Sequence, residues 1–268
     1  MKMNGLLDKA AAVARRDLLT AIRYRTGFFI TAIGTAAELA AFYYLAKALG
    51  PSFRPEGLEY FPFVLVGTGF YTFLLTGTNQ FLTTVQQAQQ TGTLEVLVTT
   101  ATPAPVLLFL SAMSAFTGAT LQMVFYLGAG LLWFGSAFHP NVSGCLVVFL
   151  LSLVVAVAFG LMAAALQLAI QKGSALVWLL GSAAWFMTGT LFPVSTLPKP
   201  LFWAGQLIPI THALNAMRRA LLEGASFAAL SNEIGILVLF CALLLPGSVA
   251  IFSYALRRAR MEGTLSFY

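Results

Sequence analysis

Few side chains in this sequence have the chemistry of a catalytic site. Of the 268 residues, 9% are charged, and His139 and His212 are the two histidines. The chain has no His-x-x-x-His pair, no paired aspartate motif and no serine–histidine arrangement within an apolar run, which disfavours a membrane-embedded enzyme. It also lacks the G-x-x-x-x-G-K-[ST] pattern of a phosphate-binding loop, so we expect that it cannot hydrolyse ATP alone. Cys145 and Cys241 lie in apolar runs and are typical of small core residues, so we expect neither a disulfide nor a metal site.

One carboxylate stands out because it lies in the middle of an apolar run. Glu38 falls near the centre of residues 28–49, where a charge costs roughly 2.5–3.5 kcal/mol to insert into a membrane. A partner in the bundle, a water-filled path or protonation must offset that cost. The sequence therefore leaves two roles open, a pathway residue or a structural contact at a helix or subunit interface. Tyr43 and Tyr44 follow near the outer end of the same run, as an aromatic belt or as part of a route for a ring-bearing substrate.

A second carboxylate lies in a polar island at residues 86–105, between two long apolar stretches. Leu94, Leu97, Val98 and Ala101 recur at helical spacing, and Glu95 lies in the first turn of the predicted helix, where a negative charge suits the helix dipole. The island predicts a short amphipathic helix in a turn between two membrane spans. Such a helix can act as a lever that a soluble partner pushes, or it can simply lie at the membrane surface.

The composition indicates that membrane-spanning helices position these carboxylates. Hydrophobic residues make up 59% of the chain and charged residues 9%, whereas soluble domains carry roughly 25% charged residues. Because a span needs about 20 residues, the length allows about six spans with short loops and no soluble catalytic domain. We therefore predict an all-α integral membrane protein, folded as a single transmembrane domain over residues 1–268. The apolar runs place its spans at residues 28–49, 60–84, 106–134, 142–170, 175–192 and 234–256.

Two further segments flank or interrupt these spans. Residues 1–26 predict an amphipathic interface helix, with a basic face toward anionic lipid headgroups or toward a partner protein. Residues 193–230 contain two apolar pieces that meet at Pro209, and each piece is too short to cross a bilayer. We expect a re-entrant or interfacial helix pair there, with Thr211 as a cap, Arg218 and Arg219 near the C-terminal end, and Gly224 after it. An ordinary interfacial loop anchored by Trp203 is the alternative.

The basic residues predict an orientation. With six spans, both termini share one side, and ten of the fifteen lysines and arginines fall on it. This excess predicts cytoplasmic termini, a cytoplasmic polar island and an external segment 193–230. The net charge of +6 therefore reflects membrane orientation and gives no reason to expect nucleic-acid binding.

Three stretches together resemble a known family. The amphipathic N-terminus comes first. The run from Gly92 through Thr93, Leu94, Glu95, Leu97 and Val98 resembles the pattern G-T-L-E-x-L-x-x-T/S. The third stretch comprises Phe192, Pro193, Pro198, Pro209 and Arg218 with their neighbours. In this order, around six predicted spans, they resemble the permease subunit of type 2 ABC exporters over the whole chain. Ile208 departs from the pattern, because an asparagine commonly precedes this proline in the family.

The resemblance implies a mechanism and partners. Residues 86–103 would form the coupling-helix loop that contacts the ATPase, and residues 193–230 would form external re-entrant helices. Two permease copies, expected as a homodimer, would form the pathway, with Glu38, Tyr43 and Tyr44 at the pathway or dimer interface. Two separate ATPase subunits would bind ATP and Mg²⁺, whereas this chain would bind no cofactor. The location would be the cell inner (plasma) membrane.

The substrate is expected to be amphiphilic, lipid-linked or drug-like, because the predicted spans are apolar and aromatic with few fixed charges. The alternative is a secondary transporter or channel driven by an ion gradient. Such proteins usually show internal repeats and broken helices, and the halves of this sequence show no clear repeat.

Overall fold

The computed structural model describes residues 25–92, 104–134, 138–170 and 173–262. Within them the chain is helical and contains no strand. In chain order the elements are α2 (Arg25–Leu49), η1 (Pro55–Gly57), α3 (Tyr60–Gln90), α5 (Ala104–Phe134), α6 (Val142–Ala169), α7 (Gly173–Met187), η2 (Val194–Thr196), α8 (Lys199–Gln206), α9 (Pro209–Leu222) and α10 (Phe227–Glu262). The predicted interface helix at residues 1–26 and most of the coupling-helix loop at residues 86–103 lie outside the described residues.

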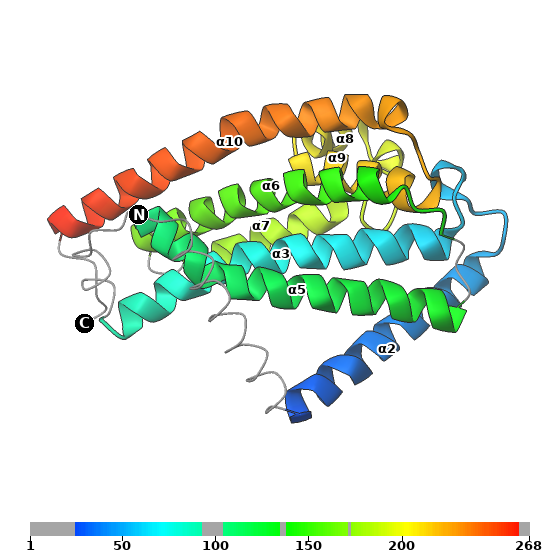
Figure 1. The fold of residues 1–268 in the computed structure, drawn as a ribbon, viewed down its shortest axis with the longest axis horizontal. Helices are drawn as coiled ribbons and strands as arrows, with labels where there is room; N and C mark the ends of the chain where they lie inside the picture. Colours follow the sequence, from blue (N-terminus) through cyan, green and yellow to red (C-terminus); the bar gives the residue numbers. More distant parts are fainter. Residues whose placement is uncertain (1–24, 93–103, 135–137, 171–172, 263–268) are drawn as a thin grey trace.

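The bundle is built around α3. This helix lies between α5 and α6, and α10 packs along the outer side of α6 (Figure 1). The first half of α3 is buried on all sides, with Phe63, Leu65 and Phe70 at most 1% exposed. A helix with apolar residues around its whole circumference is suited to such a central position.

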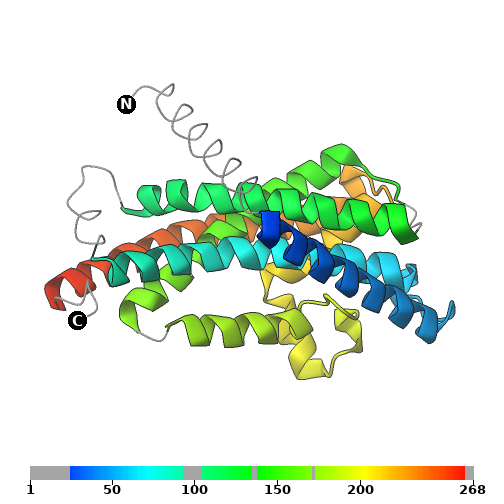
Figure 2. The same cartoon turned by 90° about the horizontal axis from the view of Figure 1, so that it is seen from below.

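Two helices lie at the periphery of this bundle. Figure 1 shows the C-terminal end of α2 beside the end of α5 and the start of α3, while the N-terminal end of α2 diverges from the bundle. Figure 2 shows α7 along one edge, joined to α6 at one end and followed by α8 at the other. Their outward faces carry large apolar side chains, such as Ile30 and Trp178, both 72% exposed. A surface of this kind suits lipid or another membrane helix.

Three of the described helices are long and apolar enough to cross a membrane, namely α3, α6 and α10. Shorter apolar helical stretches cover Phe116–Leu132 and Gly173–Met187. The all-helical membrane class expected from composition is thus confirmed for the described residues, in the coarser form of a multi-pass helical protein.

The structure corrects two of the predicted span boundaries. The fifth predicted span, 175–192, is too long, because α7 ends at Met187. Gly189 then adopts a φ of +80°, in the left-handed region that favours glycine, and the buried hydroxyls of Thr188 and Thr190 hydrogen-bond to each other at 3.1 Å. The sixth predicted span, 234–256, is only the middle of α10, since its polar flanks continue the helix in both directions. Hydropathy therefore missed a turn in one case and helical extensions in the other.

The segment 193–230 contains two short helices, α8 and α9, which meet near Pro209 as the sequence indicated. Thr211 does not cap α9, because Ile208 occupies the N-cap and Pro209 the first turn. The Thr211 hydroxyl instead donates to the Gly205 carbonyl at 2.7 Å and ties α9 to α8. Gly224 follows α9 with a φ of +63°, which agrees with its predicted role after the helix.

Candidate functional site: a membrane groove between four helices

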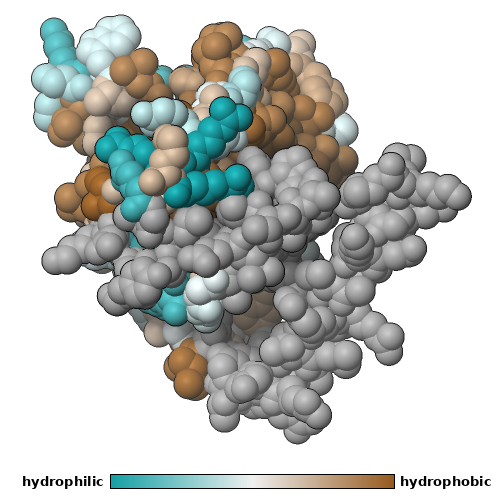
Figure 3. Space-filling view, turned by 90° about the vertical axis from the view of Figure 1, so that its left-hand side faces the viewer, coloured by the Kyte–Doolittle hydropathy of each residue, from teal (hydrophilic) through white to brown (hydrophobic). Residues whose placement is uncertain are grey.

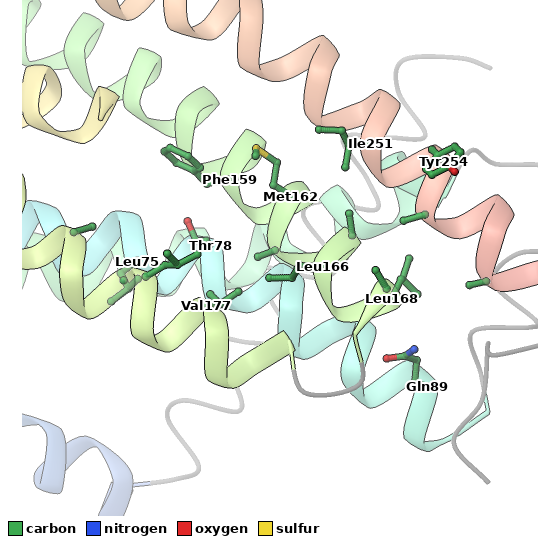
Figure 4. Close-up of a pocket in the computed structure, with 18 of the residues that line it drawn as sticks. Leu75, Thr78, Gln89, Phe159, Met162, Leu166, Leu168, Val177, Ile251 and Tyr254 are labelled. Carbon is green, nitrogen blue, oxygen red and sulfur yellow. The ribbon is translucent and has the colours of Figure 1, made fainter. Parts of the chain in front are cut away.

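A groove of about 1000 Å³ lies between α3, α6, α7 and α10 (Figure 4). Its walls are mostly aliphatic and aromatic, and Leu75, Met162, Leu166, Val177 and Ile251 are among the lining residues. The α7 helix packs beside α3 and α6 but leaves a space between itself and α10, and this space is the groove. A volume of this size is at the upper end of the range typical of sites for small organic ligands.

One hydrogen bond joins the two helices that form one wall of the groove. The Tyr71 hydroxyl of α3 donates to the Gly181 carbonyl of α7. Tyr71 is only 3% exposed, so its ring contributes to the core while its hydroxyl ends at the groove. This contact fixes the middle of α7 relative to α3.

One end of the groove is polar. Gln89 of α3 is 3% exposed and accepts a hydrogen bond from Gln167 of α6 at 3.4 Å. Arg258 and Glu262, which also line the groove, form an ion pair at 2.7 Å across one turn of α10. Figure 3 looks onto this end of the molecule and shows hydrophilic side chains gathered beside hydrophobic ones. The groove is therefore amphipathic, with apolar walls and charged and amide groups at one end.

The other end of the groove reaches the start of α9, where Ile208 and Ile210 line it. Arg218 lies on the same helix, toward the C-terminal end as the sequence indicated, but its side chain is buried and is not an exposed helix-end charge. Arg218 is 1% exposed. Its guanidinium donates to the Phe63 carbonyl at 3.1 Å and to the Thr190 carbonyl at 3.0 Å, and lies 3.5 Å from the centroid of the Phe63 ring.

The physical reason for this burial lies on α3 as well as on α9. A Cβ atom at Gly67 would lie 2.2 Å from Arg218 Nη2, so only glycine leaves room for the guanidinium. The carbonyls of Phe63 and Thr190 then supply acceptors, and the Phe63 ring supplies a cation–π contact. Arg218 thus anchors α9 to α3 and to the turn after α7.

His212 provides a second connection of the α8–α9 pair. Its Nε2 atom lies 3.0 Å from the Gln206 carbonyl, and its Nδ1 atom lies 3.8 Å from the Glu233 carboxylate of α10. The Glu233 carboxylate raises the pKa of His212, the Gln206 carbonyl adds to this rise, and burial opposes it. His212 therefore links α8, α9 and α10 most strongly when it is protonated.

The predicted pathway residues of α2 do not come together at the groove. Glu38 lines a separate small pocket against α3 and α5. Tyr43 packs edge-on against Phe61 of α3, with ring centroids 5.7 Å apart, and Tyr44 is 66% exposed.

The described residues of the other two motifs lie at opposite ends of the molecule. Phe192, Pro193 and Pro198 surround η2, with Pro193 buried and Pro198 exposed, and Pro209 is buried at the start of α9. Gly92 follows α3 with a φ of +68°. Thr93, Leu94, Glu95, Leu97 and Val98 lie outside the described residues.

The groove residues with polar groups were not found from the sequence. Tyr71 lies in a long apolar stretch, where nothing in its spacing marks a site, and Gln89 belongs to the polar island at residues 86–105, which was interpreted as a turn between spans. Arg258 and Glu262 are four residues apart, which is the spacing of an ion pair on one helix face. That signal was available, but it does not say that the pair borders a cavity. Among the described residues no group of three or more His, Cys, Asp or Glu side chains could hold a metal ion.

Comparison with known proteins identifies the family of this chain. The model of the family described as ABC-2 family transporter protein matches residues 36–250, which cover most of the chain and all four helices of the groove in whole or in part. No curated protein matches the sequence.

Proposed function

Because the chain belongs to the ABC-2 transporter family, whose membrane subunits work with an ABC ATPase, we propose that it forms the membrane pathway of an ATP-driven exporter for an amphiphilic substrate. The observation that carries the choice of substrate is the amphipathic groove between α3, α6, α7 and α10. Its apolar walls suit a hydrocarbon or ring system, and its polar end suits a headgroup. A lipid-linked or drug-like molecule has this combination, whereas a small inorganic ion does not.

The proposal includes the assembly. Two copies of this chain form a homodimer, and two ATPase subunits bind it and supply the ATP and Mg²⁺ sites. Residues 86–103 contact the ATPase through the coupling helix, with Glu95 in its first turn. Both termini and this loop lie in the cytoplasm of a cell with the protein in its inner (plasma) membrane, six spans cross the bilayer, and residues 193–230 lie on the external side.

The proposed mechanism is a shift between two populations of the bundle. Nucleotide binding brings the ATPase subunits together, and the coupling helix passes this motion to α3, since Gly92 directly follows the last turn of that helix. The Tyr71–Gly181 hydrogen bond then transmits a displacement of α3 to α7. Because α7 is peripheral, its movement changes the width of the groove at a smaller cost than movement of α6.

A reconstituted complex tests this proposal. Proteoliposomes containing the permease and its ATPase are loaded with an NBD-labelled single-chain lipid or an NBD-labelled phospholipid, and ATP-dependent movement across the bilayer is followed by dithionite quenching. Ala184→Trp places a side chain that buries about 150–250 Å² into the groove and should lower transport to less than about a tenth of the wild-type rate. Ala250→Trp, at an exposed position of α10 outside the groove, should leave the rate unchanged.

Two results count against the proposal. Equal transport by the wild type and the Ala184→Trp variant would separate the groove from the pathway. Movement of the probe that needs no ATPase but follows an ion gradient would favour the alternative of a secondary transporter.

A further inference from the structure

A second polar site lies apart from the groove, where α2 meets α3 and α5. Leu39, Phe61, Leu65, Tyr126 and Ala129 form a small apolar cluster that holds the outer half of α2 against these helices. Toward its N-terminus α2 diverges from them (Figure 1). A Cβ atom at Gly34 would have no atom within 4 Å, which agrees with open space along this part of α2.

A small pocket of about 40 Å³ lies where the helices part. Most of the side chains around it have oxygen atoms that accept hydrogen bonds, and Phe73, Met123, Gly69 and Ala119 complete the lining. The polar members are Thr35, Glu38, Thr72, Thr76, Gln122 and Tyr126.

Two groups in this pocket need a partner. Glu38 forms no ion pair with any residue that the structure describes, although a membrane charge is stable only when it is paired or hydrated. Tyr126 is 6% exposed, and its hydroxyl has no hydrogen-bond partner within the described part of the chain. The two side chains come from different helices and lie close enough to interact electrostatically. A buried hydroxyl without a partner is rare, so the Tyr126 hydroxyl can accept a hydrogen bond from a ligand that enters this pocket.

The chemistry of the lining selects the ligand. A carboxylate with hydroxyl and amide oxygens attracts a cation that can donate several hydrogen bonds, and the Phe73 and Tyr126 rings add cation–π contacts. An anionic headgroup would be repelled by Glu38. The volume holds a group the size of an ammonium or a few waters, and it is too small for a whole amphiphile. The apolar tail of such a ligand can lie along Ile30 and Ile33, both exposed on the diverging part of α2.

We propose that the pocket between α2, α3 and α5 binds the protonated primary amine of an amphiphile, with Glu38 as its counter-ion and Tyr126 as a hydrogen-bond acceptor. The inference rests on the proposed function, because it narrows the transported class to cationic amphiphiles. In this proposal the pocket binds the headgroup first, and the molecule then passes to the larger groove.

Photolabelling of the full-length protein in lipid nanodiscs tests this site without ATP or an ATPase. The probe is a long-chain alkylamine with a diazirine beside the amine, and the control probe is the alcohol of the same chain. We expect the amine to label peptides of α2, α3 and α5 in the wild type. Glu38→Gln should reduce this labelling by about tenfold or more, because a charge-assisted hydrogen bond is lost, and Tyr126→Phe should reduce it by a smaller factor.

Three comparisons make the result decisive. Glu59→Gln makes the same chemical change at an exposed N-cap without a side-chain capping bond and should label like the wild type. Equal amine labelling of the wild type and Glu38→Gln, or equal labelling by the amine and the alcohol in the wild type, would overturn the proposal. Loss of amine labelling in sodium chloride but not in tetramethylammonium chloride would also overturn it, because the site would then bind a metal cation.

The outcomes also separate this site from the proposed function. Labelling that depends on Glu38, in a complex that moves no amphiphile, would keep the site and remove the transport proposal. Transport of an amphiphile without Glu38-dependent labelling would keep the transport proposal and remove the proposed amine site.

Discussion

Arg218 joins three parts of the bundle through one side chain. Its hydrogen bonds reach Phe63 on α3 and Thr190 after α7, while its own backbone belongs to α9. A buried guanidinium is costly to leave unpaired, so these two hydrogen bonds stabilise the position of α9. We therefore expect Arg218 to control the position of the α8–α9 pair over the end of the groove.

Arg218→Ala should lower the free energy of unfolding by about 2–4 kcal/mol, because two buried carbonyls lose their donor and a cavity opens beside Phe63. The neighbouring Arg219 provides the matched control. Its side chain is 39% exposed, and its ion pair with Glu223 is long at 4.0 Å, so Arg219→Ala should change stability by less than about 0.5 kcal/mol. Unfolding in SDS-containing mixed micelles measures both variants. Similar losses for the two variants would mean that Arg218 does not anchor these elements.

The His212–Glu233 pair predicts a pH dependence of the same region. Since Glu233 raises the pKa of His212 in the folded protein, the stabilisation is fully present below the unfolded pKa of 6.5 and is lost as the pH rises through the higher folded value. The apparent melting temperature of the wild type should therefore fall between about pH 6 and about pH 8. His212→Gln should flatten this slope. A variant with the same slope as the wild type would show that another group titrates.

The sequence marked these residues but did not give their roles. The Arg218–Arg219 pair looked like two equivalent helix-end charges, since hydropathy and helix-dipole arguments treat both alike. Their difference depends on Gly67, which is distant in sequence and leaves space for only one of them. For Glu38 the sequence did indicate an unusual residue, because a carboxylate within an apolar run is visible without any structure.

At the scale of helices, glycine determines how closely α3 and α5 approach. A Cβ atom at Gly77 would lie 2.0 Å from Cε1 of Phe116, a ring that is 5% exposed and packs edge-on against Phe81. Small residues allow such contacts between membrane helices.

Gly77→Ala should destabilise the protein by about 1–3 kcal/mol, because the ring has little room to move. Gly118, on α5, has no atom within 4 Å of its would-be Cβ, so Gly118→Ala should be neutral or stabilise the helix by up to about 1 kcal/mol. The same unfolding measurement compares the two variants. A loss of stability in Gly118→Ala as large as in Gly77→Ala would contradict this description of the α3–α5 contact.

The coupling loop supplies the second prediction at this scale, as part of the proposed function. Glu95→Arg places a positive charge at the positive end of the predicted helix and removes the carboxylate proposed to face the ATPase. ATP-dependent transport should fall at least about tenfold, while the yield and melting temperature of the purified chain stay near those of the wild type. Unchanged transport would exclude Glu95 from coupling.

Helix ends were the least predictable part of the elements. The apolar runs located α3, α5, α6 and the centre of α10, because burial in lipid or protein requires apolar residues. They missed the early end of α7, since Gly189 turns the chain inside a run that remains apolar. They also missed the polar extensions of α10, because helix propensity continues where hydropathy stops.

For the whole molecule, composition and motif order indicated a multi-pass helical transporter subunit, and the family match agrees. The groove could not be predicted in this way. It depends on how far α7 and α10 stand from α3 and α6, which is a property of packing between residues far apart in sequence. The pocket at Glu38 could not be predicted either, because it forms where α2 packs on α3 and α5 over only part of its length.

We propose that this chain works as the membrane part of an ATP-driven complex, and purification of that complex is the direct test. The full-length chain is isolated by an affinity tag from its host in mild detergent, and subunit stoichiometry and vanadate-sensitive ATPase activity are measured on the same sample. We predict two copies of the chain with two copies of a soluble subunit that contains a phosphate-binding loop, and ATPase activity that elutes with them. A homo-oligomer of this chain with no ATPase subunit, obtained in several mild detergents and in nanodiscs, would be incompatible with this role.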